Sequence, residues 1–452
     1  MIHCYKLFGR NIVLDIASGA IHSVDDVAYD AIELFQTVER DLLASEIAKR
    51  HVGLPQSEIE ALILEIETLK DGGKLFTPDN FETIAAKQKK NYSLKALCMN
   101  VSHLCNMTCS YCFAGKGEYG GDGELMSLET GKRAIDFLIE NSDGRRNLDI
   151  DFFGGEPLLN WDVVKNIVTY ALSKEKDSGK NFRFTLTTNG VSVDDDVIEF
   201  SNKYMHNVVL SLDGRPEVND ANRKLNNGGA SYDFVLPKFK KFVESRGGKN
   251  YYIRGTFTRD NLDFASDILH MADLEFTELS MEPVVAKESE PYALKFDDLP
   301  AILKQYEILT KNMREKDKEG RGFKFYHFNL NFAESPCVYK RISGCGVGTE
   351  YLAVTPNGDL YPCHQFVGDD NFIMGDIWNG VNNIKLREKL CEATIYSRDE
   401  CKSCWARLYC SGGCAANNYN TTGDFHGIHK LGCEMFKKRI ECAIYLGVLG
   451  SQ

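Results

Sequence analysis

The pattern of hydrophobic and polar positions changes its period along the first part of the chain. Residues 6–24 alternate around the turns Gly9–Asn11 and Ala17–Gly19, which predicts two or three short strands. Residues 25–53 then carry apolar side chains at helical spacing and end at Gly53, and residues 54–73 repeat that spacing up to Gly72 and Gly73. Strands followed by helices predict a small module of winged-helix type over residues 1–88.

Strands alternate with helices in the middle of the chain, residues 94–300. Such alternation is typical of parallel strands joined by crossover helices. Six strand–helix units are too few for a closed eight-stranded barrel, so we expect a partial (β/α)6 barrel with its active site at the carboxyl ends of the strands. The predicted strands are 94–102, 148–155, 182–190, 207–214, 251–258 and 276–285, and helices are predicted at 127–142 and 158–176, among others.

The last part of the chain has a different composition. Residues 301–334 are helical in pattern and charged, which predicts a linker, and residues 335–452 are rich in Cys, Gly and Asn. We expect only short strands and little hydrophobic core in this tail. Metal ligation can supply the missing stability of such a segment.

Composition narrows the function classes. The formal net charge of −12 argues against partners such as nucleic acid or an anionic membrane. No apolar run approaches the roughly 18 residues of a membrane span, and the N-terminus lacks a signal-peptide pattern, so we expect a cytoplasmic protein. Fifteen cysteines in such a chain indicate metal ligation rather than disulfides.

Three cysteines directly follow the first strand of the predicted barrel, with three and then two residues between them: Cys105, Cys109 and Cys112. Iron–sulfur clusters are normally closed by four thiolates, so three leave one iron open to a small molecule. A zinc site is the alternative, but zinc sites usually combine two pairs of closely spaced cysteines, and no second pair lies nearby in the sequence. The cysteines that fit no ligand spacing are expected to be small buried hydrophobes: Cys4, Cys98, Cys391 and Cys442.

This three-cysteine run resembles the signature of the radical S-adenosylmethionine (SAM) enzymes. The resemblance implies that the three thiolates bind a 4Fe–4S cluster whose open iron chelates the methionine part of SAM. Reduction, by a donor of flavodoxin or ferredoxin type, then yields a 5′-deoxyadenosyl radical. Tyr111 matches the aromatic position that lies next to adenine in the family.

Polar motifs end the next three predicted strands: GGEP at 154–157, TTNG at 187–190 and SLDG at 211–214. Each motif alone is ordinary strand-ending turn chemistry. By resemblance they contact SAM, with Glu156 accepting the methionine ammonium and Arg223 pairing with the carboxylate; a surface arginine is the alternative for Arg223. The SAM-binding residues expected on this basis are Tyr111, Gly154, Gly155, Glu156, Thr188, Asn189, Ser211, Asp213 and Arg223.

The tail carries seven cysteines in two spaced blocks: Cys345 and Cys363 with Gly358 between them, and Cys401, Cys404, Cys410 and Cys414 in the run CKSCWARLYCSGGC, followed by Cys433. This pattern resembles the SPASM domain, an auxiliary-cluster extension of radical enzymes that modify peptides. The resemblance implies two further 4Fe–4S clusters, so the expected cofactors are three clusters and SAM. Cys337 is either a further ligand of auxiliary cluster I, or one iron of that cluster is open to a substrate thiolate. The alternative for the tail as a whole is that its clusters only transfer electrons. The implied ligands are Cys345, Cys363 and Cys414 for auxiliary cluster I, and Cys401, Cys404, Cys410 and Cys433 for auxiliary cluster II.

The order of the three parts resembles the maturases of the six-cysteines-in-forty-five-residues (SCIFF) peptides, which are sactipeptide synthases. This implies thioether crosslinks, of α, β or γ type, between a cysteine sulfur and an acceptor carbon in a cysteine-rich precursor peptide. The N-terminal module would bind the precursor's leader as an added strand. The alternatives are a formylglycine-forming enzyme of the anaerobic sulfatase-maturing type and a plain electron carrier, which would need none of the strand-end motifs. No catalytic acid or base is assigned.

Overall fold

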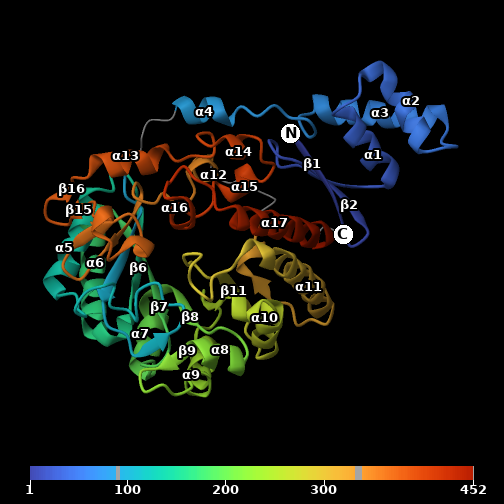
Figure 1. Cartoon of the computed structure of the whole chain (residues 1–452). Helices are drawn as coiled ribbons and strands as arrows, with labels where there is room; N and C mark the ends of the chain where they lie inside the picture. Colours follow the sequence, from blue (N-terminus) through green and yellow to red (C-terminus); the bar gives the residue numbers. More distant parts are fainter. Residues whose placement is uncertain (88–91, 331–337, 451–452) are drawn as a thin grey trace.

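The computed structural model describes residues 1–87, 92–330 and 338–450 (Figure 1). A sheet of eleven described strands runs through the middle and the tail of the chain, in the order β12-β11-β10-β8-β7-β6-β4-β13-β14-β15-β16. The N-terminal module has its own antiparallel sheet and lies on the side of α17 (Lys430–Gly450).

The N-terminal module has the expected strands followed by helices. Its helical stretch 25–53 was predicted as one unit and is instead two helices, α1 and α2, separated at residues 36–39. Asp25 caps α1 by accepting a hydrogen bond from the Ala28 N–H at 2.7 Å. The elements are β1 (Ile2–Leu7), β2 (Arg10–Asp15), β3 (Ile21–Val24), α1 (Asp26–Phe35), α2 (Arg40–Arg50) and α3 (Gln56–Asp71).

The middle of the chain forms the partial barrel, and all six predicted strands are present and parallel. Side chains alternate along each strand: Phe152 is buried toward the helices, and its neighbour Phe153 is half-buried on the other face. The strands are β4 (Ala96–Ser102), β6 (Asn147–Gly154), β7 (Asn181–Thr188), β8 (Met205–Ser211), β10 (Tyr252–Phe257) and β11 (Glu278–Pro283). The main helices are α5 (Leu128–Glu140), α6 (Trp161–Ser178), α7 (Asp195–Tyr204), α8 (Pro216–Asn222), α9 (Tyr232–Ser245) and α10 (Phe264–Asp273).

The predicted linker is part of the barrel body. Helix α11 (Leu299–Lys318) packs against α10 and α17 and buries Tyr306 completely. The two-residue strand β12 (Lys324–Phe325) then extends the sheet beside β11.

The tail has more regular structure and more core than its composition predicted. Strand β13 (Tyr351–Val354) pairs in parallel with β4, and Phe366, Phe372 and Phe425 form a buried cluster. The tail strands are short, as expected, but the tail also forms helices. The expectation of little core was wrong, because large aromatics that are sparse in sequence converge in space. The other tail elements are α12 (Val338–Ser343), β14 (Asp359–Tyr361), β15 (Gly375–Asp376), β16 (Gly380–Val381), α13 (Ile384–Glu392), α14 (Asp399–Lys402), α15 (Arg407–Cys410) and α16 (Ala415–Thr422).

The N-terminal module is docked on the tail. The rings of His3 and Trp405 stack with centroids 3.7 Å apart, and the Tyr5 hydroxyl donates to the Glu441 carbonyl at 3.0 Å. The connecting segment, with α4 (Phe81–Lys87), adds an ion pair of 2.6 Å between Asp79 and Arg407. Among the described helices, none has both the length and the apolarity needed to cross a membrane.

Candidate cofactor and cluster sites

The first cysteine group lies in the loop that follows β4. Short strand β5 (Met107–Cys109) pairs with β9 (Arg223–Leu225), so that Cys109 is opposite Arg223. The loop is bound to the end of β6 because the Gly155 N–H donates to the Ser102 carbonyl at 2.7 Å and the Glu156 N–H to the Leu104 carbonyl at 2.8 Å. Gly154 and Gly155 therefore allow close approach of two backbones beside Cys105.

The thiols of this group interact electrostatically with one another. Burial raises the pKa of Cys105 to about 12, with smaller contributions to this rise from Glu156, Cys109 and Cys112. Burial also raises the pKa of Cys109, and Arg223 opposes that rise. Thiolates here need a compensating positive charge, which iron supplies.

The donor set therefore fits an iron–sulfur cluster. In the described ranges, no three His, Cys, Asp or Glu side chains converge on one metal ion. A cluster does not require that, because its thiolates bind different irons.

Strands β6 and β7 bring two predicted motifs together next to Cys105. The fully buried Glu156 carboxylate accepts hydrogen bonds from Thr188 Oγ1 and the Asn189 N–H, both at 2.8 Å. Burial raises its pKa to about 7 in spite of these bonds. Asn189 Nδ2 lies 3.6 Å from Cys105 Sγ. Glu156 thus stabilises the strand-end turn, and its contact with SAM stays a prediction.

The end of β8 completes the group of predicted SAM residues. The Tyr111 hydroxyl donates to Asp213 Oδ2 at 2.6 Å and accepts from Arg223 Nη1 at 3.1 Å. Burial raises the pKa of Asp213, and the Arg223 charge opposes that rise. Arg223 is buried, which excludes the surface-arginine alternative. Ser211, half-buried, ends β8 on the same side.

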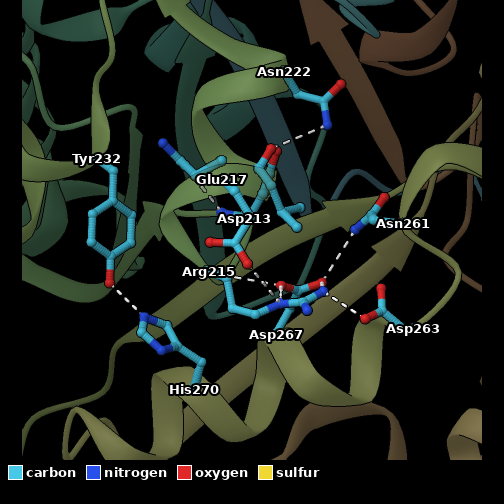
Figure 2. A network of polar contacts seen from close by, with 11 residues as sticks. Asp213, Arg215, Glu217, Asn222, Tyr232, Asn261, Asp263, Asp267 and His270 are labelled. Atoms are coloured by element: carbon cyan, nitrogen blue, oxygen red, sulfur yellow. Dashed lines mark hydrogen bonds and ion pairs between the residues drawn. The ribbon is translucent and has the colours of Figure 1, made fainter.

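A second polar network supports this strand end (Figure 2). Asp267 of α10, fully buried, accepts from Arg215 Nε at 2.7 Å and from the Arg215 N–H at 3.1 Å. A Cβ at Gly214 would come within 2.2 Å of the Asp267 Cβ, so only glycine fits there. The network fixes the backbone directly after Asp213.

Several asparagines that position the cysteine loop were missed from sequence. Asn226 Nδ2 donates to the Cys105 carbonyl at 3.0 Å, and Asn189 Nδ2 donates to Asn106 Oδ1 at 2.8 Å. Asn222 Oδ1 accepts from Ser110 Oγ at 2.7 Å. The strands that these asparagines flank, β5 and β9, are only three residues long and leave no periodic pattern in the sequence. The density of Asn around the cysteines and around Arg223 was therefore the only signal.

The tail cysteines lie in two groups. Burial raises the pKa of Cys363 well above its usual value, and the nearby Cys414 and Cys345 raise it further. In the second group, burial raises the pKa of Cys410 to about 12, with smaller contributions to this rise from Cys433, Cys401 and Cys404. These two groups are the sets that the resemblance assigns to auxiliary clusters I and II, and ligation itself stays a prediction.

The first auxiliary group (Cys345, Cys363 and Cys414) lies against the carboxyl ends of the barrel strands, which we call the open end of the sheet. His364, which follows Cys363, has its ring 5.0 Å from Phe153 at the end of β6 and 5.6 Å from Phe113. A cavity of about 370 Å³ opens on the other side, beside Cys345 and under α4. Cys337, the other candidate ligand, lies outside the described residues.

Two family models match the chain: the radical SAM superfamily at residues 99–263 and the iron–sulfur cluster-binding SPASM domain at residues 345–405. The radical SAM cyclopropyl synthase TigE of Paramaledivibacter caminithermalis is 22% identical and covers 93% of this chain and 89% of its own. The cysteine-type anaerobic sulfatase-maturating enzyme of Clostridium novyi is 25% identical and covers 77% and 95%.

Solved structures show the same fold. The structure of anSMEcpe with bound AdoMet and a Cp18Cys peptide has a TM-score of 0.64 at 22% identity and covers 79% of this chain and 99% of its own. Streptococcus suis SuiB bound to precursor peptide SuiA has a TM-score of 0.54 at 17% identity and covers 93% and 96%. The matched domains imply iron–sulfur clusters and SAM. The chain thus joins a radical SAM domain of partial-barrel fold to a C-terminal SPASM domain, and it is homologous to radical SAM maturases.

Proposed function

We propose that the chain is a peptide maturase that forms thioether crosslinks in a ribosomally made, cysteine-rich precursor. Bound SAM supplies a radical that removes one hydrogen from an acceptor carbon. The substrate's cysteine thiol would lose a proton, its sulfur would bond that carbon, and the one electron released would pass to a cluster held by the tail cysteines. The peptide loses two hydrogens overall, as in the sactipeptide and SCIFF maturases that the chain resembles.

The observation that carries this proposal is the position of the Cys345, Cys363 and Cys414 group at the open end of the barrel sheet. His364 packs there on Phe153 and on Phe113, which directly follows Cys112. A peptide between the two groups would have its sulfur near an auxiliary iron and its acceptor carbon near the radical. Cys337 or the substrate thiolate would supply the remaining ligand of a cluster held by Cys345, Cys363 and Cys414.

The N-terminal module supports a substrate with a leader segment. Strand β3 pairs only with β2 in the described chain, so one of its edges can accept an added peptide strand. The matches to TigE and to SuiB each cover 93% of this chain, and the SuiB structure holds a precursor peptide. The match to the sulfatase-maturating relative covers 77%. A peptide substrate with a leader would give the N-terminal module a role, which the sulfatase-maturing alternative does not.

Mass spectrometry of a cysteine-rich precursor peptide after reaction with the protein tests this proposal. The reconstituted and reduced protein should release 5′-deoxyadenosine and give a peptide that has lost two hydrogens and whose crosslinked cysteines resist alkylation. Loss of two hydrogens with all thiols still alkylated would indicate a carbon–carbon bond and contradict the proposal. A formylglycine product would favour the sulfatase-maturing alternative, which the 25% identical relative keeps as the second candidate.

A further inference from the structure

We propose that Arg254 and Glu282 hold one backbone amide of the substrate peptide at the open end of the sheet, with Glu282 accepting its N–H and Arg254 donating to its carbonyl. This inference rests on the proposed peptide substrate. It names the two side chains that position the peptide.

The two residues lie on the same face of neighbouring strands. In the parallel pair β10–β11, Thr256 is beside Glu282 and Arg254 is beside Ser280. Ile253 and Leu279 are fully buried against the helices, so the alternating positions Arg254 and Glu282 face the inside of the partial barrel. Their side chains are diagonal neighbours, and the Glu282 charge acts on Cys414 of the first auxiliary group.

Glu282 is held through one of its two carboxylate oxygens. His327 Nε2 lies 3.2 Å from Oε1, and Ser280 Oγ donates to the same atom at 3.4 Å. Arg439 Nη1 donates to His327 Nδ1 at 3.3 Å, which leaves the imidazole hydrogen on Nε2. Oε2 has no hydrogen bond or ion pair in the described part of the chain, and the side chain is 28% exposed.

Glu282 is an ionised acceptor. Burial raises its pKa, whereas His327 and the charges of Arg254 and Arg439 lower it, and its pKa lies below the usual range. A charged acceptor with a free oxygen forms strong hydrogen bonds.

Arg254 is the complementary donor. Its charge acts on Glu282, Tyr326 and His364, yet within residues 1–87, 92–330 and 338–450 its side chain forms no hydrogen bond and no ion pair within 4.0 Å. Opposite charges on adjacent strands normally pair. Here Glu282 lies beside His327 instead, and a peptide unit, with one donor and one acceptor, matches the pair on both sides.

Conservative variants test the pair. Glu282→Gln and Arg254→Gln should each raise the KM for the precursor and lower the ratio of crosslinked peptide to 5′-deoxyadenosine about tenfold, as expected for one charge-assisted hydrogen bond. Iron content and peptide-free cleavage of SAM should stay at the wild-type level. The matched controls are Glu278→Gln, at the other end of β11 and paired with Lys324 at 2.8 Å, and Arg183→Gln, paired with Asp149; both should behave as wild type.

Amide-to-ester replacement in the precursor separates a backbone contact from a side-chain contact. In the wild type, one ester position in the core segment should lose coupling about tenfold, and Glu282→Gln should lose nothing further at that position. If Glu282→Gln loses iron, Arg254→Gln with the same ester series decides the question.

Two results overturn the inference. Coupling at the wild-type level in both variants would do so, and so would an ester effect that is the same with and without the Glu282 carboxylate, which would point to a cationic side chain of the substrate. If the wild type modifies no peptide at all, the proposed function fails together with the inference, and this outcome is distinct from the other two.

Discussion

At the scale of single residues, the first cysteine site depends on backbone that only glycine can form. Gly117 has φ +91°, and an added Cβ would lie 2.8 Å from the Cys105 Cβ and 2.9 Å from the Gly155 Cα. A side chain there would displace the chain that carries Cys105. The close contact of three segments, more than any one side chain, shapes this site.

Gly117→Ala is therefore expected to lose one cluster, about four irons per chain, together with release of 5′-deoxyadenosine. Gly115→Ala is the matched control, because Gly115 also has positive φ, +55°, but no atom lies within 4 Å of its added Cβ. Iron counting and a single-turnover assay measure both variants. Full iron in the Gly117 variant would contradict the close packing around Cys105.

The half-buried Asp151 on β6 should make stability depend on pH. Burial raises its pKa to about 6, with a smaller contribution to this rise from Asp149. The folded chain then keeps a proton that the unfolded chain releases, so stability falls as pH rises from about 4 to about 6 and stays lower above that. Asp151→Asn should raise the free energy of unfolding by about 2–3 kcal/mol near pH 8 and change little near pH 4.

Urea unfolding at several pH values checks this dependence. Glu199→Gln, at an exposed position of α7, should leave the whole profile unchanged. An Asp151→Asn profile parallel to that of the wild type would show that the carboxyl group titrates normally in the folded chain.

At the scale of elements, β2 connects the N-terminal module to the rest of the molecule. Ile12 and Leu14 join the core of the body, whereas Val13 joins the module's own core, so β2 is buried on both faces. The Asp79–Arg407 pair and the His3–Trp405 stack add contacts to the segment that carries Cys404 and Cys410. The module is thus held against the second auxiliary group.

Asp79→Ala should weaken this docking, because it leaves the nearly buried Arg407 without its carboxylate. We expect a loss of about 3 kcal/mol in unfolding free energy and faster hydrogen exchange in β1. Asp26→Ala removes an exposed carboxylate paired with Lys6 and should have no measurable effect. Equal exchange rates in β1 for both variants would show that the ion pair does not hold the module.

At the scale of the whole molecule, the three groups of cysteines lie in two domains, the barrel and the tail, and one continuous sheet runs through both. Strand β13 of the tail pairs with β4, the strand before Cys105, so the first and the auxiliary groups share a scaffold. His364 and Phe113 meet between them. This proximity suits the transfer of an electron from the peptide to an auxiliary cluster after the radical step.

If all three groups bind clusters, the reconstituted protein should hold about twelve irons. Cys105→Ala should lower this to about eight and abolish release of 5′-deoxyadenosine, while the tail clusters remain visible by electron paramagnetic resonance. Cys98→Ala is the control: Cys98 is buried in the core and should keep all the iron. About four irons in the wild type would remove the auxiliary clusters from the proposal.

Local patterns in the sequence determined the six parallel strands, most helices and the grouping of cysteines by spacing, because periodicity and ligand spacing are properties of short segments. Only the tertiary structure decided that β13 joins β4, that the predicted linker is part of the core, and that Arg223 is buried beside Tyr111 and Asp213. The placement of Arg254 and Glu282 on one face of neighbouring strands is of the same kind. These features depend on strand register and on contacts between residues far apart in the chain, and no local pattern encodes either.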